Sequence, residues 1–480
     1  MLQCELTSDE NIVHVYGKTT QLQHTLKPYT HKHNHWLLPT HVALKHAKRI
    51  QMPEYMQRLL AAKHNMLEPG PRPNNIPNHT WDKLFQYQKN TVSTVVNRFK
   101  GRCMLAHDMG LGKTVQAIAL MQHYGSPVLV LCPAFLKDNW AQEIHKWAPD
   151  IQAHIQSYDS LRNHPPLTQP WKLVVADEAH YIKQKDAQRT IAAMPVLMEC
   201  NHAVLLSGTP CPNRPEELFV PLHVLRPNIV RNFNTFAIRY CNARKTKFSN
   251  FDTTGATRKH ELAWLLKRAF MIRLRKKDVL QELPPKICNT VHIHTTHTKA
   301  IADIATLREE MEDANPHRIK FIVTEMFRKT CQAKMTQAVQ YVVQRAMQGP
   351  VVAFAHHRAM LDALQEHAHK HKLTTARIDG HTNMQNRQHT VDKIQQGDAV
   401  DVACLSMAAA GVGFTITAMS RVVFMELPWN PAVLHQCEDR VYRIGQQNTC
   451  YIEYLICKDT LDTQLWNKIL RKESLVDILI

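Results

Sequence analysis

The chain has 480 residues, of which 44% are hydrophobic and 21% are charged, and this composition excludes a disordered protein. At roughly 100–200 residues per domain, the length provides for about two to four domains. The formal net charge of +18 favours a polyanionic partner such as a nucleic acid, and basic solubility or binding to a membrane surface are the alternative explanations.

The cysteine pattern indicates a reducing compartment. The 12 cysteines occur singly, without a C-x-x-C pair, and Cys132 and Cys404 lie within apolar runs. The sequence has neither an apolar run of about 18 residues nor a signal peptide, so we expect an intracellular protein that is not secreted. The histidine-rich stretch at 31–35 has no paired cysteines, and we interpret it as a polar segment rather than a metal site.

The N-terminal part of the chain differs in pattern from the remainder. Residues 1–75 show weak periodicity, and we predict an N-terminal accessory region there. The stretch at 68–78 (EPGPRPNNIPN) is rich in proline, which is typical of a linker.

From residue 80 the pattern becomes that of an α/β lobe. Short apolar runs rich in valine and leucine alternate with amphipathic segments at 113–124 and 136–147. This alternation predicts a parallel sheet with helices on both faces. The predicted strands are 103–108, 127–133, 171–177 and 202–208.

A second lobe of the same kind follows a helical, basic stretch at about 211–345. The fold class is therefore α/β, with two tandem lobes and helical insertions between them. We place the first lobe at 76–285 and the second at 286–480, which ends in a C-terminal brace helix. The predicted strands of the second lobe are 351–357, 374–380, 401–407, 421–427 and 450–456.

A glycine-containing turn, MGLGKT at 109–114, follows the first predicted strand of the first lobe. Gly110 and Gly112 allow successive backbone N–H groups to point at a phosphate, and the next helix adds its positive N-terminal end. Lys113 would reach the β- and γ-phosphates of ATP, and Thr114 would offer its hydroxyl to Mg²⁺. The alternative is an ordinary glycine-containing turn.

Two adjacent carboxylates end another buried strand of the first lobe. Asp177 and Glu178 belong to VVADEAH at 174–180. Adjacent carboxylates are common on surfaces, but at the end of a buried strand they are costly unless a cation pairs with them. Asp177 suits coordination of Mg²⁺, and Glu178 suits activation of the attacking water, so we predict an ATPase.

The second lobe carries two arginines three residues apart, Arg440 and Arg443, in QCEDRVYRIGQ at 436–446. This spacing places both on one face of a helical turn, from which a guanidinium group can reach the charge that develops on the γ-phosphate. A solvated charged helix is the alternative interpretation.

The ordered set of motifs resembles superfamily-two helicases and, more narrowly, the Snf-type (SWI/SNF-related) helicase-like ATPases. The resemblance covers about 80–470 and implies two RecA-like lobes. The chain is most similar to the annealing-helicase branch, the matrix-associated A-like proteins, and residues 15–40 resemble the HARP accessory domain of that branch. The motifs are FQYQ (85–88), DMGLGKT (108–114), DEAH (177–180), SGTP (207–210), RIDGHT (377–382), AAAGVGFT (408–415) and QCEDRVYRIGQ (436–446).

The resemblance assigns further residues to the site. Gln88 would read the adenine edge, and Gln436 would support the two arginines. Ser207 and Thr209 would link the ATP state to the DNA groove, and Gly413 would sense nucleotide and DNA. The ATP loop would consist of Asp108, Met109, Gly110, Leu111, Gly112, Lys113 and Thr114.

Three positions depart from the family pattern without removing a catalytic group. Thr91 replaces the usual glycine after the YQ pair, and Ala410 replaces a common glycine. His107 replaces a common acidic residue and also stands where the full P-loop pattern has glycine.

Contacts with DNA are predicted to be directed at phosphates, with little reading of bases. The candidates lie in loops that follow strand ends: Lys137, Arg214, His381 and Arg387, in addition to Ser207 and Thr209. The run RLRKKD at 273–278 adds positive charge, and a solvated helix face is the alternative interpretation of it.

These predictions combine into an ATP- and Mg²⁺-dependent translocase on double-stranded or forked DNA, a nuclear monomer that remodels or reanneals DNA structures. Single-strand-binding protein or chromatin would be further partners. A nucleosome- or protein-displacing remodeller, a strand-separating helicase and a non-hydrolysing DNA-binding scaffold are the alternatives.

Overall fold

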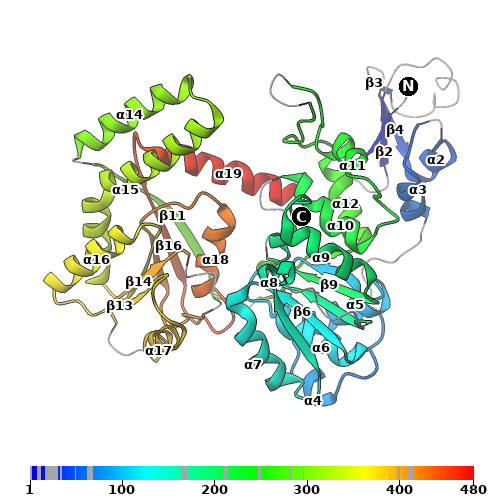
Figure 1. The fold of residues 1–480 in the computed structure, drawn as a ribbon, viewed down its shortest axis with the longest axis horizontal. Coiled ribbons are helices and arrows are strands. Elements are labelled where there is room, and N and C mark those ends of the chain that lie inside the picture. Colours follow the sequence, from blue (N-terminus) through cyan, green and yellow to red (C-terminus); the bar gives the residue numbers. More distant parts are fainter. Residues whose placement is uncertain are drawn as a thin grey trace. The chain divides into compact units, whose positions relative to one another are not determined.

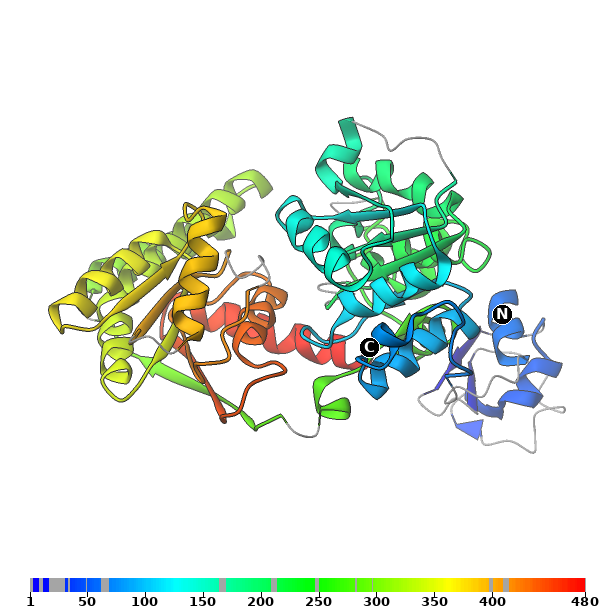
Figure 2. The same cartoon turned by 90° about the horizontal axis from the view of Figure 1, so that it is seen from below.

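The computed structural model describes residues 3–7, 12–16, 31–32, 35–48, 50–61, 69–163, 170–208, 214–246, 250–280, 283–295, 297–396, 400–408 and 414–479. The chain divides into two units, the first built mainly from residues up to Val279 and the second mainly from Leu280–Ser474. Each unit contains its own six-stranded sheet, and Figures 1 and 2 show each sheet among the helices of its unit. Among the described residues, no helix combines the length and apolar character needed to cross a membrane.

The N-terminal region contains a small antiparallel sheet with the strand order β1-β2-β4-β3. Side chains on one face of it, among them Leu6, Val13 and Trp36, are buried in the same hydrophobic cluster as helices of the first unit. The elements are β1 (Gln3–Leu6), β2 (Ile12–Tyr16), β3 (His31–Lys32), β4 (His35–Pro39), α2 (Thr40–Lys45) and α3 (Glu54–Ala61).

A buried ion pair joins this sheet to the first unit. Glu261 is fully buried and accepts hydrogen bonds from Arg239 Nε at 2.6 Å and from Leu6 N at 3.4 Å. Arg239 also donates to Cys4 O. A buried carboxylate needs such partners, and the N-terminal sheet provides one of them through the hydrogen bond from Leu6 N.

The first unit has a parallel sheet in the order β10-β5-β9-β8-β6-β7. Parallel order requires crossover connections, which the intervening helices provide (Figure 1). The strands are β5 (Arg102–Leu105), β6 (Val128–Cys132), β7 (Ala153–Ser157), β8 (Leu173–Ala176), β9 (His202–Leu206) and β10 (Met271–Ile272).

Alternate residues of these strands enter two separate cores, because successive side chains point to opposite faces of a sheet. Cys103 and Leu105 pack with α4 (Asn78–Trp81), α5 (Gln86–Asn97), α6 (Lys113–Tyr124) and α7 (Lys137–Trp147). Met104 packs on the other face, where the helices are α8 (Tyr158–Asn163), α9 (Gln188–Glu199), α10 (Phe219–Leu225), α11 (Phe233–Tyr240) and α12 (Lys259–Ala269).

The second unit repeats this arrangement with the strand order β11-β16-β15-β12-β14-β13, again fully parallel. Val352 and Phe354 face one core, and Val351 and Ala353 face the other. The strands are β11 (Lys286–Ile293), β12 (Val351–Ala355), β13 (Thr375–Ile378), β14 (Val402–Ser406), β15 (Arg421–Phe424) and β16 (Cys450–Cys457). The helices are α14 (Thr298–Glu312), α15 (Pro316–Ala346), α16 (Arg358–Lys370), α17 (Met384–Gln395), α18 (Pro431–Val441) and α19 (Leu461–Leu479).

All nine predicted strands are confirmed, each within a residue or a few of its predicted ends. Three strands of the two large sheets were not predicted: β7, β10 and β11. Strand β11 lies at a sheet edge and exposes most of its residues, so it lacks the apolar run that marks a buried strand. The stretch between the lobes is mostly helical, as predicted, apart from β10 and β11.

Candidate nucleotide-binding site

The loop between β5 and α6 has the conformation that a phosphate-binding turn requires. Gly110 and Gly112 have φ of +80° and +71°, which is the left-handed region. Gly112 is also the N-cap of α6, so the N-terminal N–H groups of that helix begin directly after it. The predicted strand–turn–helix context is therefore confirmed, while the binding of phosphate there stays a prediction.

Lys113 and Thr114 are the first two residues of α6. The Lys113 ammonium donates to His107 O at 2.9 Å and to Asp108 O at 3.3 Å, so it lies against the carbonyl groups of its own loop. Phosphate oxygens are the same kind of acceptor with more negative charge. The loop therefore fits a triphosphate that takes over these hydrogen bonds from the carbonyls.

Gln88 lies directly against the glycine turn. Its side-chain oxygen accepts a hydrogen bond from Phe85 N at 3.0 Å and caps the start of α5. Its amide nitrogen lies only 2.4 Å from the position that a Cβ at Gly112 would take. The structure thus brings Gln88 and the ATP loop together, as the resemblance implies.

Asp108 is engaged by the segment that follows β10. Its carboxylate accepts from Arg273 Nη2 at 3.1 Å and from Lys276 N at 2.9 Å, and its backbone N–H donates to Leu274 O. The Asp108 carboxylate therefore connects the loop to the segment after β10. Arg273 is only 14% exposed, so the charge of this one residue of RLRKKD is paired with Asp108 next to the loop.

The predicted metal ligand Asp177 follows β8. Its carboxylate accepts from Trp140 Nε1 at 2.9 Å and from Glu178 N at 2.8 Å. Burial raises the pKa of Asp177 to about 6, and the charge of Glu178 adds to this rise, while Lys113 lowers it. A carboxylate whose own charge is poorly solvated in this way is well suited to bind a cation.

Glu178 has a strained backbone, with φ +48° and ψ 51°. A non-glycine residue in this region costs of order 1–3 kcal/mol, and such strain concentrates at functional sites. Its carboxylate lies 3.1 Å from His180 Nδ1, and both side chains are about one-fifth exposed. The DEAH motif thus turns sharply after β8 and starts the short 3₁₀ helix η2 (Ala179–Ile182).

Ser207 follows β9, which lies between β5 and β8 in the sheet. Its N–H donates to Leu105 O at 3.1 Å, and the residue is fully buried. The glycine turn, Ser207 and Asp177 therefore follow the carboxyl ends of three adjacent strands, β5, β9 and β8. Ligands of α/β folds bind at the carboxyl ends of the strands. Thr209 lies outside the described residues.

In the second unit, the two arginines pack on the segment that follows the AAAGVG motif. Arg440 lies in the last turn of α18 and donates to Phe414 O at 3.4 Å, and Arg443 Nη1 donates to Thr415 Oγ1 at 2.7 Å. Gln436 lies one turn before Arg440 on α18 and is half-buried. Gly413 lies outside the described residues.

A buried carboxylate anchors the same helix. Glu438 is 2% exposed and accepts from Lys286 Nζ and from Tyr454 OH, both at 2.8 Å. Burial alone would raise the pKa of Glu438, but hydrogen bonds and charge from His435 and Lys286 outweigh it and hold the pKa at about 2. This anchor fixes the orientation of α18 relative to β11 and β16.

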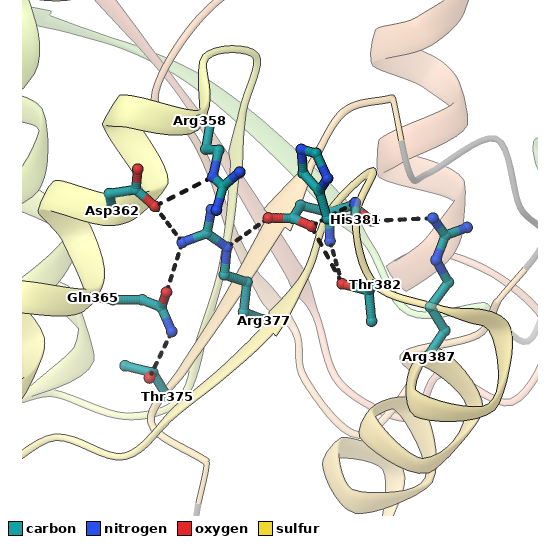
Figure 3. Close-up of polar contacts among 9 residues, drawn as sticks. Arg358, Asp362, Gln365, Thr375, Arg377, His381, Thr382 and Arg387 are labelled. Carbon is teal, nitrogen blue, oxygen red and sulfur yellow. Dashed lines mark hydrogen bonds and ion pairs between the residues drawn. The ribbon is translucent and has the colours of Figure 1, made fainter.

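Of the candidate DNA contacts, Arg214 and His381 lie outside helices and strands, as predicted. Lys137 and Arg387 were predicted in loops but are helical residues, the first of α7 and the fourth of α17. Lys137 is exposed at the start of α7, and Arg214 is half-exposed and lies 3.8 Å from Glu216. Figure 3 shows the loop after β13, where Arg387 Nη2 donates to Asp379 O at 3.0 Å and the His381 ring is exposed. Arg387 thus stabilises the loop that carries His381.

Arg377 supports this loop from β13. It donates to Asp379 Oδ2 at 2.9 Å, to Asp362 Oδ1 at 2.6 Å and to Gln365 Oε1 at 2.7 Å (Figure 3). Arg377 thus has a structural role beside the predicted DNA contacts His381 and Arg387.

One cluster in the second unit has the composition of a metal site. Cys331, His357 and Glu426 place one potential ligand atom each within 4.8 Å of the others. His357 Nδ1 and Glu426 Oε1 are 2.6 Å apart, which is a direct hydrogen bond. Glu426 also accepts from the backbone N–H groups of His356 and His357, so it fixes the chain after β12 without a metal.

Several residues of the site were not predicted. Trp140 orients Asp177, and Tyr158 donates to the backbone oxygen of Asp177 at 2.7 Å. His107 was noted only as a departure from the family pattern, yet it is fully buried and forms contacts on three sides. Its burial is consistent with its position at the end of an apolar run, which was the available signal.

Two family models match the chain, one after the other along the sequence. The first describes an SNF2-related domain and matches residues 87–160 and 150–302. The second describes the helicase conserved C-terminal domain and matches residues 333–445.

Named relatives match over most of this chain. The SWI/SNF-related matrix-associated actin-dependent regulator of chromatin subfamily A-like protein 1 homolog of Caenorhabditis elegans is 34% identical over 422 residues, 82% of this chain and 61% of that protein. The DNA annealing helicase and endonuclease ZRANB3 of Homo sapiens is 35% identical over 437 residues, 83% of this chain and 40% of that protein. This chain therefore spans only part of the length of these relatives.

A solved structure, the Sulfolobus solfataricus SWI2/SNF2 ATPase core in complex with dsDNA, gives a TM-score of 0.42 at 23% identity, over 85% of this chain and 94% of that chain. The assignment of family therefore rests on the sequence matches. The two domain models match in the order in which the two sheets follow each other, and the motifs lie at the strand ends described above. The chain belongs to the SNF2-related family of helicase-like ATPases.

Proposed function

We propose that this chain is an ATP-dependent double-stranded DNA translocase that remodels or reanneals DNA structures such as forks. The observation that carries the proposal is the gathering of Lys113, Asp177 and Glu178 at one edge of the first sheet, close enough for the charge of Lys113 to lower the pKa of Asp177. The printed name of the human relative, a DNA annealing helicase, supports the choice of substrate.

The residues of the first unit divide the work at the nucleotide. The N–H groups at the start of α6 and the Lys113 ammonium bind the phosphates, and Gln88 binds the adenine edge. Mg²⁺, when bound, neutralises charge on the β- and γ-phosphates, and Thr114 and Asp177 would hold it. Glu178 orients the attacking water and accepts its proton.

The second unit would supply positive charge to the reaction. Arg440 and Arg443 are the candidates, with Gln436 in support. Their guanidinium groups contact Phe414 O and Thr415 Oγ1 in this structure, and these weak neutral acceptors can be exchanged for a phosphate oxygen. Hydrolysis would then depend on both units.

Contacts with DNA would be made through phosphates and would weaken with salt. The candidates are Lys137, Ser207, Thr209, Arg214, His381 and Arg387. We also propose that the protein acts as a monomer in the nucleus. Single-strand-binding protein or chromatin would be encountered at its DNA substrates.

Two assays test the proposal. ATP hydrolysis is measured with single-stranded, double-stranded and forked DNA, and reannealing is measured on a DNA bubble coated with single-strand-binding protein. We expect stimulation by double-stranded or forked DNA, and ATP-dependent reannealing that Lys113→Ala abolishes while DNA binding persists. Stimulation by nucleosomes alone would instead identify a chromatin remodeller, and absence of any hydrolysis would leave a DNA-binding scaffold.

A further inference from the structure

We infer that His107 is a positioning residue for the nucleotide site. Its side chain holds Gln88, the Lys113 loop and the segment after β10 in fixed positions relative to one another. The inference rests on the proposed function, since it concerns the same site. It does not follow from the family pattern, because His107 is one of the positions where this chain departs from that pattern.

The His107 side chain joins three elements. Its Nε2 lies 3.2 Å from Gln116 Oε1 on α6 and 3.4 Å from Thr91 Oγ1 on α5. Its Nδ1 accepts a hydrogen bond from Leu274 N at 3.2 Å, in the segment that follows β10. His107 is fully buried, and its partners Thr91 and Gln116 are buried as well. These contacts therefore form in a region without competing water.

The protonation state of the ring follows from these partners. Burial lowers the pKa of His107 to about 3, and the charge of Lys113 adds to this effect, so the ring is neutral at physiological pH. Because Leu274 N donates to Nδ1, the single proton of the neutral ring lies on Nε2. Nε2 then donates to Gln116 Oε1 and Thr91 Oγ1. An acidic side chain at this position would accept from both directions and could not form the same set of bonds.

Two of the departures from the family pattern thus form one contact. The Thr91 hydroxyl donates to Tyr87 O at 2.9 Å, which leaves its oxygen to accept from His107. Thr91 lies one turn after Gln88 on α5, so its hydrogen bond with His107 fixes the position of the helix turn that carries Gln88. Gln88 in turn lies against Gly112, with its amide nitrogen 2.4 Å from the position of an added Cβ. A small shift of α5 would therefore displace Gln88 from the turn.

Two substitutions separate the two sides of the ring. In His107→Gln the amide nitrogen can replace Nε2 as donor to Gln116, whereas in His107→Asn the amide oxygen can replace Nδ1 as acceptor for Leu274 N. We expect Asn to raise the Kd for ADP and the KM for ATP about fivefold, the equivalent of the ~1 kcal/mol of one lost hydrogen bond. We expect Gln to remain within about twofold of the wild type.

A cycle with Gln88→Ala distinguishes positioning from a general structural effect. If His107 acts through Gln88, the double variant His107→Asn/Gln88→Ala has the same Kd for ADP as Gln88→Ala alone. His145→Gln, on the exposed face of α7, is the matched control and should leave the Kd unchanged. Gln116→Met, which removes the acceptor at similar volume, replaces His107→Asn if that variant does not fold.

The Kd for ADP also distinguishes this inference from the proposed function. A wild-type protein that binds ADP but does not hydrolyse ATP with DNA would defeat the proposed function and leave the role of His107 testable. An unchanged Kd for ADP in His107→Asn, or an effect that adds fully to that of Gln88→Ala, would overturn the inference.

Discussion

A methyl group added at Gly112 would overlap the Gln88 side chain, which lies against the ATP loop. The φ of +71° costs an L residue about 1–2 kcal/mol, and the new Cβ would lie 2.4 Å from Gln88 Nε2. Gln88 must then move, which removes its hydrogen bond to Phe85 N, worth about 1 kcal/mol. We expect Gly112→Ala to lower the free energy of unfolding of the first unit by about 2–3 kcal/mol and to weaken nucleotide binding by about tenfold or more.

Gly101→Ala is the matched control for this prediction. Gly101 has φ +74°, and a Cβ there would lie 2.4 Å from His202 Nδ1, so strain and overlap are similar. Gly101 precedes β5, whereas Gly112 lies beyond its other end, so the control leaves the ATP loop untouched. Thermal unfolding and calorimetric titration with ADP should show similar destabilisation but a weaker affinity only in Gly112→Ala. Wild-type affinity for ADP in Gly112→Ala would show that nucleotide binding does not depend on the contact between Gln88 and the glycine turn.

Three further predictions concern stability. Burial holds the pKa of His107 at about 3 in the folded state, whereas a histidine in the unfolded chain takes up its proton with a pKa of about 6.5. The wild type should therefore lose about 2 kcal/mol of unfolding free energy between pH 7 and pH 5 relative to His107→Gln. Equal pH profiles of the two proteins in urea titrations would contradict this. Asp462→Asn breaks the buried pair with Lys334, whose atoms are 2.7 Å apart, and should cost about 3 kcal/mol or more in the same assay, since the lysine is fully buried. The Glu438 carboxylate, with its pKa held at about 2, stabilises the fold above about pH 4.5 and loses this contribution as the pH falls towards 2. Glu438→Gln should therefore lower the free energy of unfolding by about 3 kcal/mol at pH 7 and by little near pH 2. Acid titration of the two proteins would reveal this difference.

The two large sheets could be predicted from the sequence because their strands are buried on both faces. The run 128–132 is apolar throughout and 402–406 is apolar except for Ser406, and every residue in both runs is buried. Strand β11 follows the opposite pattern, with an exposed edge position and polar residues, so only its pairing with β16 identifies it. The antiparallel N-terminal sheet also escaped prediction, because β2 buries only alternate residues such as Val13 and Val15 and has no continuous apolar run.

The site could be predicted in its motif residues but not in the residues that hold them. The glycine turn and the Asp177–Glu178 pair have local patterns that imply their chemistry. Trp140 is 37 positions from its partner Asp177, and Leu274 is 167 positions from His107, so their hydrogen bonds depend on tertiary packing. Asp108 was placed at the nucleotide by its motif, but tertiary packing pairs its carboxylate with the segment after β10.

Single-turnover ATP hydrolysis by Arg443→Ala in the presence of duplex DNA tests whether both units act on one triphosphate. The Arg443 side chain belongs to the second unit, whereas Lys113 and Thr114 of the phosphate loop belong to the first. We predict that this variant binds ADP with wild-type affinity and hydrolyses ATP at least about a hundredfold more slowly, because the charge on the γ-phosphate is no longer neutralised from the second unit. Wild-type hydrolysis by Arg443→Ala would contradict the claim that both units act on one triphosphate.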